Sequence, residues 1–263
     1  MDNIVLTQSE FAVIQKLVFK ETGISLGDKK INMVQNRLNK RVEHYKLNNY
    51  ADYLKIVQIS KTEKTEFLNC ISTNETYFFR ETKHFEFLED IVKRSTSIRV
   101  WSAAASMGAE AYSIAMMLDS NLSKNSWEVV GSDINTQVLD IARKGLYQLS
   151  WSQKIPKRFK IKYCFKGSGN FENKMLIDRA LSKNMNFIEN NLMEKNNDIG
   201  KFDVIFLRNV LLYFTEETKI KVIKNVISSL NQGGYLILSL TEYFDEKKVG
   251  NLKFLKNSIY QKV

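Results

Sequence analysis

From about residue 98 onward, apolar segments of strand length alternate with segments of helical periodicity, and this alternation constrains the fold more than any other feature of the sequence. The predicted strands are 98–101, 127–131, 202–207 and 235–240, and the predicted helices are 109–118, 135–142 and 216–230. Strands that alternate with helices favour a mostly parallel sheet covered on both faces. We therefore predict an α/β fold, in which ligands bind beyond the carboxyl ends of the strands.

Two regions depart from this alternation. Residues 1–72 show helical spacing of apolar side chains, with helices expected near 29–46 and 50–59, and they predict a small all-α domain. Residues 151–187 interrupt the alternation with Lys-rich, glycine-containing sequence, which indicates a small inserted subdomain. The sequence has a single proline, Pro156, so no Pro-rich linker separates the regions and we expect them to touch.

Composition excludes several classes of protein. Hydrophobic residues make up 44% of the chain and charged residues 26%, as in a globular protein and unlike a disordered one. No apolar run reaches the roughly 18 residues that a membrane span needs, and the first residues lack the layout of a signal peptide. Cys70 and Cys164 have no metal-ligand spacing and only two histidines are present, so we expect a cytoplasmic protein without a metal site.

The net charge of +10 favours a polyanionic partner, whether nucleic acid, anionic lipid or an acidic protein surface. On the predicted helix 29–46, apolar residues fall on one face, and a basic stripe adjoins it, formed by Lys30, Arg37, Arg41 and His44. The helix can therefore bury one side and present a basic edge to a partner. A second basic cluster lies within 151–187.

Candidate ligand-binding residues follow the predicted strands. The loop 102–108 contains three alanines, two serines and one glycine, so a ligand can approach it closely. It is neither a G-x-G-x-x-G motif nor a P-loop, so the usual basis for binding a dinucleotide or a phosphate chain is missing. Asp133 follows the second strand and suits either ribose hydroxyls or the capping of the next helix. A nucleoside ligand without a diphosphate loop points towards S-adenosyl-L-methionine.

Four motifs, in this order along the chain, resemble the CheR family, the chemotaxis receptor glutamate methyltransferases. They are NETYFFRE (74–81), WSAAASMGAEAYS (101–113), GSDI (131–134) and FDVIFLRNVLLYF (202–214). The resemblance runs from about residue 5 to 245. It implies a Rossmann-like S-adenosylmethionine-dependent methyltransferase domain over 73–263, with a small inserted β-subdomain at about 151–187. It also implies a small all-α N-terminal domain over 1–72 that recognises the receptor.

The resemblance assigns roles to individual positions. The cofactor-binding residues that it implies are Asn74, Thr76, Arg80, Glu110, Asp133, Asn191, Leu192, Arg208 and Asn209. Among these, Glu110 would lie near the charged methionyl end and Asp133 near the ribose. Arg80 and Tyr213 would orient the substrate carboxylate and are the predicted catalytic residues. Read without the family, Ser72 and Glu75 fit a capping box that would start a helix, and Tyr213 fits a core aromatic.

The activity implied by the resemblance is transfer of a methyl group from S-adenosyl-L-methionine to glutamate side chains of chemotaxis receptors, with S-adenosyl-L-homocysteine as the product. A glutamate carboxylate is ionised at neutral pH and needs no strong general base, so positioning should dominate. The implied partner is the cytoplasmic domain of the membrane receptors, contacted by Lys30, Arg37 and Arg41. In some members the inserted subdomain also binds a receptor C-terminal tether by strand addition. We expect a monomer that does not insert into the membrane.

Two alternatives remain at this point. The family loop usually reads S-T-G-E-E-P-Y-S, whereas residues 106–113 read SMGAEAYS and keep one acid, Glu110. This change motivates a non-catalytic relative that binds receptors or cofactor, which failure to bind S-adenosyl-L-homocysteine would favour. The net charge motivates a nucleic-acid methyltransferase, although the sequence has no Asp/Asn-Pro-Pro-Tyr motif and neither cysteine follows a proline. Salt-sensitive binding to RNA or DNA would favour that second alternative.

Overall fold

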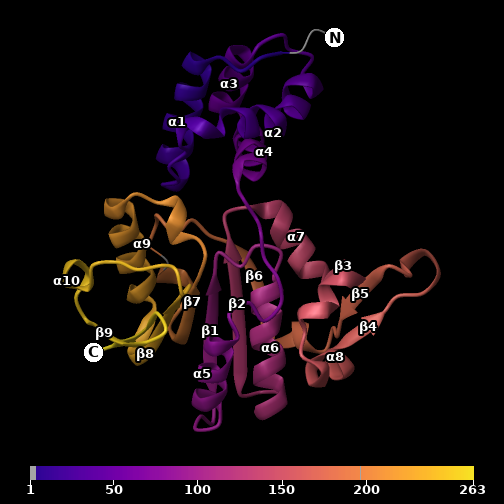
Figure 1. The fold of residues 1–263 in the computed structure, drawn as a ribbon, viewed down its shortest axis with the longest axis vertical. Helices are drawn as coiled ribbons and strands as arrows, with labels where there is room; N and C mark the ends of the chain where they lie inside the picture. The colour runs from indigo at the N-terminus through magenta and orange to yellow at the C-terminus, as the bar shows by residue number, and fades with distance from the viewer. Residues whose placement is uncertain (1–3, 196) are drawn as a thin grey trace.

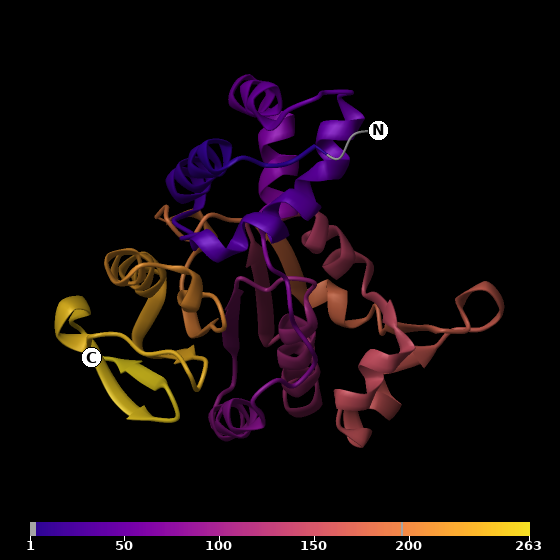
Figure 2. The ribbon, with the colours of Figure 1, turned by 45° about the horizontal axis from the view of Figure 1, so that its top comes forward.

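The computed structural model describes residues 4–195 and 197–263, so residues 1–3 of the predicted N-terminal domain lie outside the described residues. The chain forms a small helical domain that sits over one end of a larger α/β domain (Figure 1). Figure 2, turned so that the top comes forward, shows the same helical domain covering that end of the central sheet. The two domains therefore touch, as the absence of a Pro-rich linker predicts.

The helical domain contains four α-helices within the described residues: α1 (Gln8–Thr22), α2 (Ile31–His44), α3 (Tyr50–Ile59) and α4 (Lys61–Ile71). Thr7 and Glu10 form a capping box at the start of α1, and Gly23 ends that helix in the left-handed conformation with φ 75°. A 3-10 turn, Asp28–Lys30, leads into α2, so the helix begins two residues after the start of the predicted 29–46, and it ends two residues before the predicted end. Apolar faces of the four helices share one core.

The central sheet has seven strands in the order β6-β2-β1-β7-β8-β10-β9. Their bounds are β1 (Ile98–Ala103), β2 (Trp127–Asp133), β6 (Met185–Glu189), β7 (Phe202–Leu207), β8 (Leu230–Leu238), β9 (Leu252–Lys256) and β10 (Ile259–Lys262). The first five strands in that order are parallel, and β10 runs antiparallel to both of its neighbours. The predicted α/β class with a mostly parallel sheet is confirmed.

The helices that accompany this sheet within the described residues are α5 (Thr82–Val92), α6 (Ala109–Asn121), α7 (Thr136–Lys144), α9 (Glu216–Ser228) and the short α10 (Glu246–Val249). Close packing at the β2–β6 pair depends on Gly131, because a Cβ there would lie 2.6 Å from the ring of Phe187. Among the residues that the structure describes, no helix has the length and apolar character to span a bilayer.

The inserted subdomain is a second, three-stranded antiparallel sheet with the order β3-β5-β4. It is built from β3 (Leu146–Gln148), α8 (Lys157–Tyr163), β4 (Cys164–Lys166) and β5 (Lys174–Ile177). The predicted range 151–187 therefore begins after β3 and runs into β6, which pairs with β2 in the central sheet. A three-residue strand such as β3 carries too little alternation to be read from sequence. β6 has five residues, of which only Phe187 is buried, so the prediction did not separate it from the insertion.

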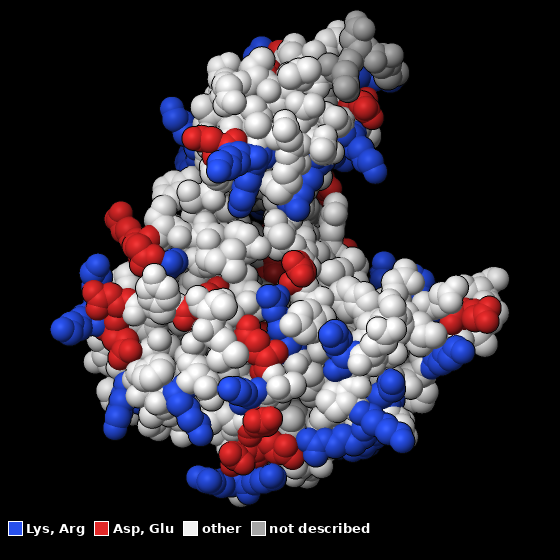
Figure 3. All heavy atoms as spheres, in the orientation of Figure 1, with Lys and Arg blue, Asp and Glu red and all other residues white. Residues whose placement is uncertain are grey.

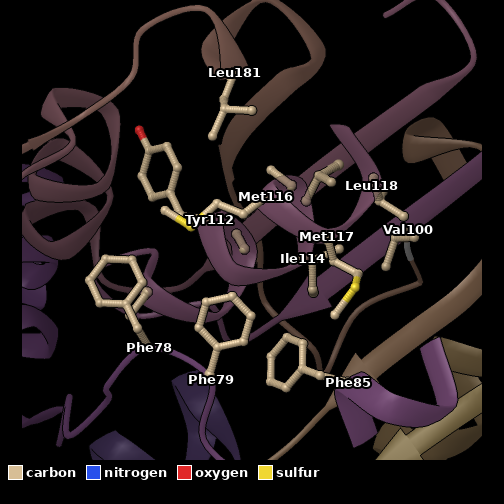
Figure 4. Packing of buried hydrophobic residues seen from close by; sticks show 14 of the residues in the cluster. Phe78, Phe79, Phe85, Val100, Tyr112, Ile114, Met116, Met117, Leu118 and Leu181 are labelled. Carbon is tan, nitrogen blue, oxygen red and sulfur yellow. The ribbon is translucent and has the colours of Figure 1, made fainter. Parts of the chain in front are cut away.

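The aromatic pair Phe78 and Phe79 anchors the first motif in the core of the α/β domain (Figure 4). The Phe79 ring stacks on that of Phe159 with centroids 5.0 Å apart. The backbone N–H of Phe79 donates to Ser113 Oγ on α6 at 3.0 Å. Both phenylalanines are buried. The polar residues on either side of them are thereby held against a rigid helix, next to the ends of the central strands.

Candidate functional site

A cavity lies between the helical domain and the carboxyl ends of the parallel strands. Loops after β1, β2, β6 and β7 line it, together with the segment 71–77 that joins the domains. The helical domain closes the cavity with side chains between the end of α1 and the first turn of α2, namely Thr22, Ile24, Leu26, Lys30 and Met33, and with Ile71 at the end of α4. Figure 3 shows the molecule hollowed beneath the helical domain, with acidic and basic side chains visible around the hollow.

All nine predicted cofactor residues line this cavity. They are Asn74, Thr76, Arg80, Glu110, Asp133, Asn191, Leu192, Arg208 and Asn209. The predicted catalytic residue Tyr213 also lines it, and so does Lys30, which was predicted to bind the receptor. Residues separated by more than a hundred positions in the sequence thus share one surface, because parallel strands end at the same edge of the sheet.

Glu110 lies in the first turn of α6, where the helix dipole favours a negative charge. Its carboxylate accepts hydrogen bonds from Ser102 Oγ at 2.7 Å and from Arg208 Nη1 at 3.0 Å. Burial raises the pKa of Glu110, although Arg208 and Ser102 oppose that change. A carboxylate can accept about four hydrogen bonds, so Glu110 keeps acceptor capacity toward the cavity.

Asp133 ends β2, and both of its carboxylate oxygens face backbone donors. The N–H of Ser106 donates to Oδ2 at 2.8 Å and the N–H of Asn135 donates to Oδ1 at 2.9 Å. Burial raises the pKa of Asp133, and these N–H groups oppose the rise. The N-cap of α7 is Asn135, not Asp133, which removes the capping interpretation and leaves the carboxylate on the cavity wall.

The loop after β1 has an unusual backbone. Ala104 and Ser106 have positive φ angles of 61° and 51°, and Gly108 follows with φ 84°. Such conformations cost free energy in residues other than glycine and tend to occur at functional sites. The loop directs the Ser106 N–H at Asp133, and its alanines bring backbone and methyl groups, without bulk, to the cavity.

The segment that joins the two domains is not helical between Ser72 and Tyr77, so the capping-box interpretation of Ser72 and Glu75 is wrong. The carbonyl of Asn74 instead accepts a hydrogen bond from Ser106 Oγ at 3.1 Å, which ties the segment to the loop after β1. The guanidinium of Arg80 lies 5.4 Å from the centroid of the Tyr77 ring.

Tyr213 lies in the 3-10 turn Leu211–Tyr213, directly after the loop that follows β7. Burial and the nearby Glu75 carboxylate raise the pKa of Tyr213, so its hydroxyl stays protonated. The ammonium group of Lys30 lies 5.5 Å from the centroid of the Tyr213 ring. The Tyr213 carbonyl accepts a hydrogen bond from the N–H of Ser25 at 2.8 Å, so the helical domain holds this turn in place.

One supporting residue at the site was not predicted. Glu242 is buried, and its carboxylate accepts hydrogen bonds from the N–H groups of Asn209, Leu211 and Ser239 at 2.9, 2.8 and 3.1 Å. Burial raises its pKa. This carboxylate fixes the loop that leads to Tyr213. In the sequence, Glu242 is a single acid shortly after the last parallel strand. Nothing in the pattern around it shows that three backbone N–H groups will surround it.

Asn191, in the loop after β6, connects the two domains. The side-chain amide of Asn191 donates to the carbonyl of Glu21 in the helical domain at 2.8 Å, and its oxygen accepts from the N–H of Met193 at 3.0 Å. Leu192 is buried and offers an apolar surface to the cavity.

Arg37 and Arg41, predicted to bind the receptor, lie outside the cavity lining and already have partners within the chain. Arg37 Nη1 donates to the carbonyls of Ile71 and Ser72 at 2.6 and 3.0 Å, where α4 ends. Arg41 pairs with the buried carboxylate of Glu63. The predicted basic stripe is therefore partly an internal structural element.

The comparisons with known proteins agree with this geometry. The chain matches "CheR methyltransferase, all-alpha domain" over residues 9–72 and "CheR methyltransferase, SAM binding domain" over residues 74–260. It is 35% identical over 249 residues to the chemotaxis protein methyltransferase of Escherichia coli K12, across 92% of this chain and 87% of that protein. The chemotaxis protein methyltransferase of Borreliella burgdorferi is 32% identical over 277 residues, across 99% of this chain and 96% of that protein. The chain belongs to the CheR methyltransferase family.

Membership of the CheR family makes the chain a methyltransferase that uses S-adenosyl-L-methionine, as the four motifs predict. The alternatives of a nucleic-acid methyltransferase and of a non-catalytic relative are set aside. The residues around the cavity also fit this cofactor chemically. Glu110 and Asp133 each accept two hydrogen bonds within the described residues and can accept more, as an ammonium group and ribose hydroxyls require.

Proposed function

We propose that the chain methylates glutamate side-chain carboxylates of chemotaxis receptors, giving glutamate methyl esters. S-Adenosyl-L-methionine, when bound, would supply a methyl group from its sulfonium: a substrate carboxylate oxygen would bond to the methyl carbon while the carbon–sulfur bond breaks, with S-adenosyl-L-homocysteine as the leaving group. The observation that carries the proposal is the shared cavity, in which Arg80 and Tyr213 accompany the predicted cofactor residues. A glutamate substrate needs no general base, and the cavity supplies groups for orientation.

Each group has a separate task in this proposal. Glu110 holds the cationic methionyl end and Asp133 the ribose hydroxyls, while Leu192 covers the adenine. Arg80 orients the substrate carboxylate through charge-assisted hydrogen bonds. The hydroxyl of Tyr213, kept protonated by burial and by Glu75, donates to the second carboxylate oxygen.

The experiment that tests this proposal follows labelled methyl from S-adenosyl-L-methionine into membranes of the source organism. We expect label in receptor-sized bands that mild alkali releases as methanol, the behaviour of a carboxyl methyl ester. Label that survives alkali would contradict the proposal, and so would no transfer to intact receptors.

Two substitutions test the predicted catalytic residues in the same assay. Arg80→Ala should lower kcat/KM by about tenfold or more, and Tyr213→Phe by a few-fold, because both remove orientation of the carboxylate. The matched controls are Arg94→Ala and Tyr243→Phe, which change exposed side chains of the same types. Turnover within about twofold of wild type in both test variants would make the assignment wrong.

For the receptor, we propose that acidic helices of its cytoplasmic domain lie along α2. Because Arg37 and Arg41 bond within the chain, the exposed basic residues of α2 that remain for a partner are His44, which belongs to the stripe, and Lys40, one turn before it. Charge reversal by Lys40→Glu should weaken receptor methylation and leave S-adenosyl-L-homocysteine affinity unchanged. If the wild type and Lys40→Glu methylate the receptor equally, α2 is not part of the surface that binds the receptor.

The inserted sheet offers a second contact for a receptor tether. β4 lies at an edge of that sheet, with Phe165 exposed and Lys and Arg side chains gathered around α8 (Figure 3). An exposed edge can accept an extended peptide as a further strand. A peptide from the receptor C-terminus should bind the wild type and lose affinity in Phe165→Ser. Equal affinity of the two proteins would exclude this edge.

A further inference from the structure

Glu81 is a mostly buried acid whose position the helix beside it does not explain. It occupies the N-cap position of α5 with φ 59°, a left-handed conformation, yet its side chain makes no capping hydrogen bond. Its carboxylate points instead to the residues that directly follow the central strand β8. Oε1 accepts from Ser239 Oγ at 2.8 Å and Oε2 accepts from the N–H of Leu240 at 3.0 Å.

The same carboxylate lies against Arg208. Oε2 of Glu81 is 3.3 Å from Arg208 Nη2, and Arg208 Nη1 donates to Glu110 at 3.0 Å. The Arg208 side chain is only 1% exposed, so solvent does little to screen these charges. One buried guanidinium is therefore shared between two carboxylates, and only Glu110 lines the cavity.

His84, whose Nδ1 lies 3.3 Å from Glu81 Oε2, adds no charge to this cluster at neutral pH. Its ring is buried, and Nε2 lies 2.8 Å from the carbonyl oxygen of Asn257, which can only accept, so Nε2 carries the proton. Burial and Arg208 lower the pKa of His84, which keeps the ring neutral. For Glu81, burial acts to raise the pKa, but Arg208, Ser239 and the Leu240 N–H outweigh it, so the pKa is lowered and the carboxylate stays ionised.

We propose that Glu81 is a positioning residue for cofactor recognition, which takes up part of the Arg208 charge so that Glu110 stays net negative toward the cavity. Without Glu81, the guanidinium would pair with Glu110 alone and cancel its charge. S-Adenosyl-L-methionine carries one positive charge more than S-adenosyl-L-homocysteine. Both ligands carry the ammonium group, but only S-adenosyl-L-methionine also carries a sulfonium charge, on the same methionyl chain. A net negative Glu110 beside that chain therefore raises the affinity for the methyl donor relative to that for the product. This inference rests on the proposed role of Glu110 at the cationic end of the cofactor.

The test is calorimetric titration of the purified protein with S-adenosyl-L-methionine and, separately, with S-adenosyl-L-homocysteine. Glu81→Gln keeps the side-chain size and removes the charge. We expect it to weaken methyl-donor binding about fivefold more than product binding. Glu81→Asp retains the charge, and Glu86→Gln removes a charge from the exposed side of α5, so both should keep the wild-type affinity ratio within about twofold.

If Glu81→Gln weakens the binding of both ligands equally, Glu81 has only a structural role and the proposal is overturned. If Glu81→Gln weakens neither, the affinity ratio is also unchanged and the proposal is overturned as well. If Glu81→Gln does not fold, Glu81→Ser is the second neutral variant, since water can replace the missing oxygens. Failure of both neutral variants to fold while Glu81→Asp folds would also overturn it. Glu110→Gln, titrated in parallel, separates the two proposals: if it shifts the ratio and Glu81→Gln does not, only the role of Glu81 fails.

Discussion

Two carboxylates, the buried Glu63 in the helical domain and the mostly buried Glu110 under the cavity, pair with arginines and yet differ in how completely they are satisfied. Glu63 accepts from Arg41 through two guanidinium nitrogens, from the Tyr53 hydroxyl at 2.8 Å and from the Tyr45 hydroxyl at 2.9 Å. Those four donors use the full capacity of a carboxylate. Glu110 has two donors and opens on the cavity.

The two carboxyl groups have pKa shifts in opposite directions. For Glu63, burial acts to raise the pKa, but the hydrogen bonds from Arg41, Tyr53 and Tyr45 outweigh it and lower the pKa. For Glu110, burial outweighs Arg208 and Ser102 and raises the pKa. A fully satisfied carboxylate stabilises the fold, whereas an incompletely satisfied one gains its missing partners when a cationic ligand binds. Substitutions at the two sites should therefore affect different properties.

The largest expected effect is the loss of stability in Glu63→Ala. The substitution leaves Arg41 and two tyrosine hydroxyls without their common partner, and breaking a buried ion pair costs about 3–5 kcal/mol. Denaturant unfolding monitored by circular dichroism measures this loss. Glu43→Ala, at an exposed position of α2, is the control and should change stability little. A loss below about 1 kcal/mol in Glu63→Ala would show that the cluster is not structural.

Next in size is the loss of cofactor affinity in Glu110→Gln. Removal of the charge should weaken S-adenosyl-L-methionine binding about tenfold or more, equivalent to about 1.4 kcal/mol. Because burial disfavours the ionised form of Glu110, stability at neutral pH should not fall by a comparable amount. Calorimetric titration and thermal unfolding of the same sample measure both. Glu217→Gln, at an exposed site, is the matched control. If Glu110→Gln lost stability without losing affinity for S-adenosyl-L-methionine, Glu110 would have the structural role assigned here to Glu63.

Arg37→Ala should lower both the stability of the protein and its affinity for the cofactor product, each by less than the two substitutions above. Its guanidinium holds the carbonyls of Ile71 and Ser72, where the helical domain continues into the cavity segment. Loss of these hydrogen bonds should cost about 1–2 kcal/mol of stability and weaken S-adenosyl-L-homocysteine binding a few-fold. Lys40→Ala, on the exposed side of α2, should change neither. If Arg37→Ala resembles Lys40→Ala in both measurements, the link between the two domains does not pass through this residue.

Much of this site could be predicted because strand ends converge. Asp133 and Arg208 follow predicted parallel strands, and the topology alone brings such positions together. The family resemblance added Asn191 and Tyr213, and all four line one cavity. What the sequence did not reveal is pairing across long separations. Nothing in the local pattern around Glu63 shows that Arg41 and two tyrosines surround it.

The fold was predicted with the same limits. Strands of five or more residues with a following helix were found, whereas Leu146–Gln148 was missed and β6 was assigned to the insertion. The antiparallel pair β9 and β10 was not predicted either. β9 is exposed after Leu252 and β10 has only four residues, so neither strand shows the alternation of a half-buried strand. The number of stripe residues on α2 that are free to bind a partner was overestimated. Helical spacing gives the direction of the Arg41 side chain but does not show that Glu63 on α4 pairs with it.

The smallest expected effect is a difference between the two carboxylates on acidification. The raised pKa of Glu110 means that this group takes up a proton as the pH falls toward its ordinary range, and ligand binding must then expel that proton. Affinity for S-adenosyl-L-methionine should be about halved at the pH where Glu110 is half protonated in the free protein. Glu63 has a lowered pKa, so its stabilising contribution is present above the ordinary carboxyl pKa and is lost only as the pH falls through the lower folded value.

Affinity for S-adenosyl-L-methionine should therefore decline at a pH where the free energy of unfolding is still constant. Glu110→Gln should flatten the profile of affinity against pH. Titrations and denaturant unfolding over the same pH series test this order, and a simultaneous decline would mean that both carboxylates are structural.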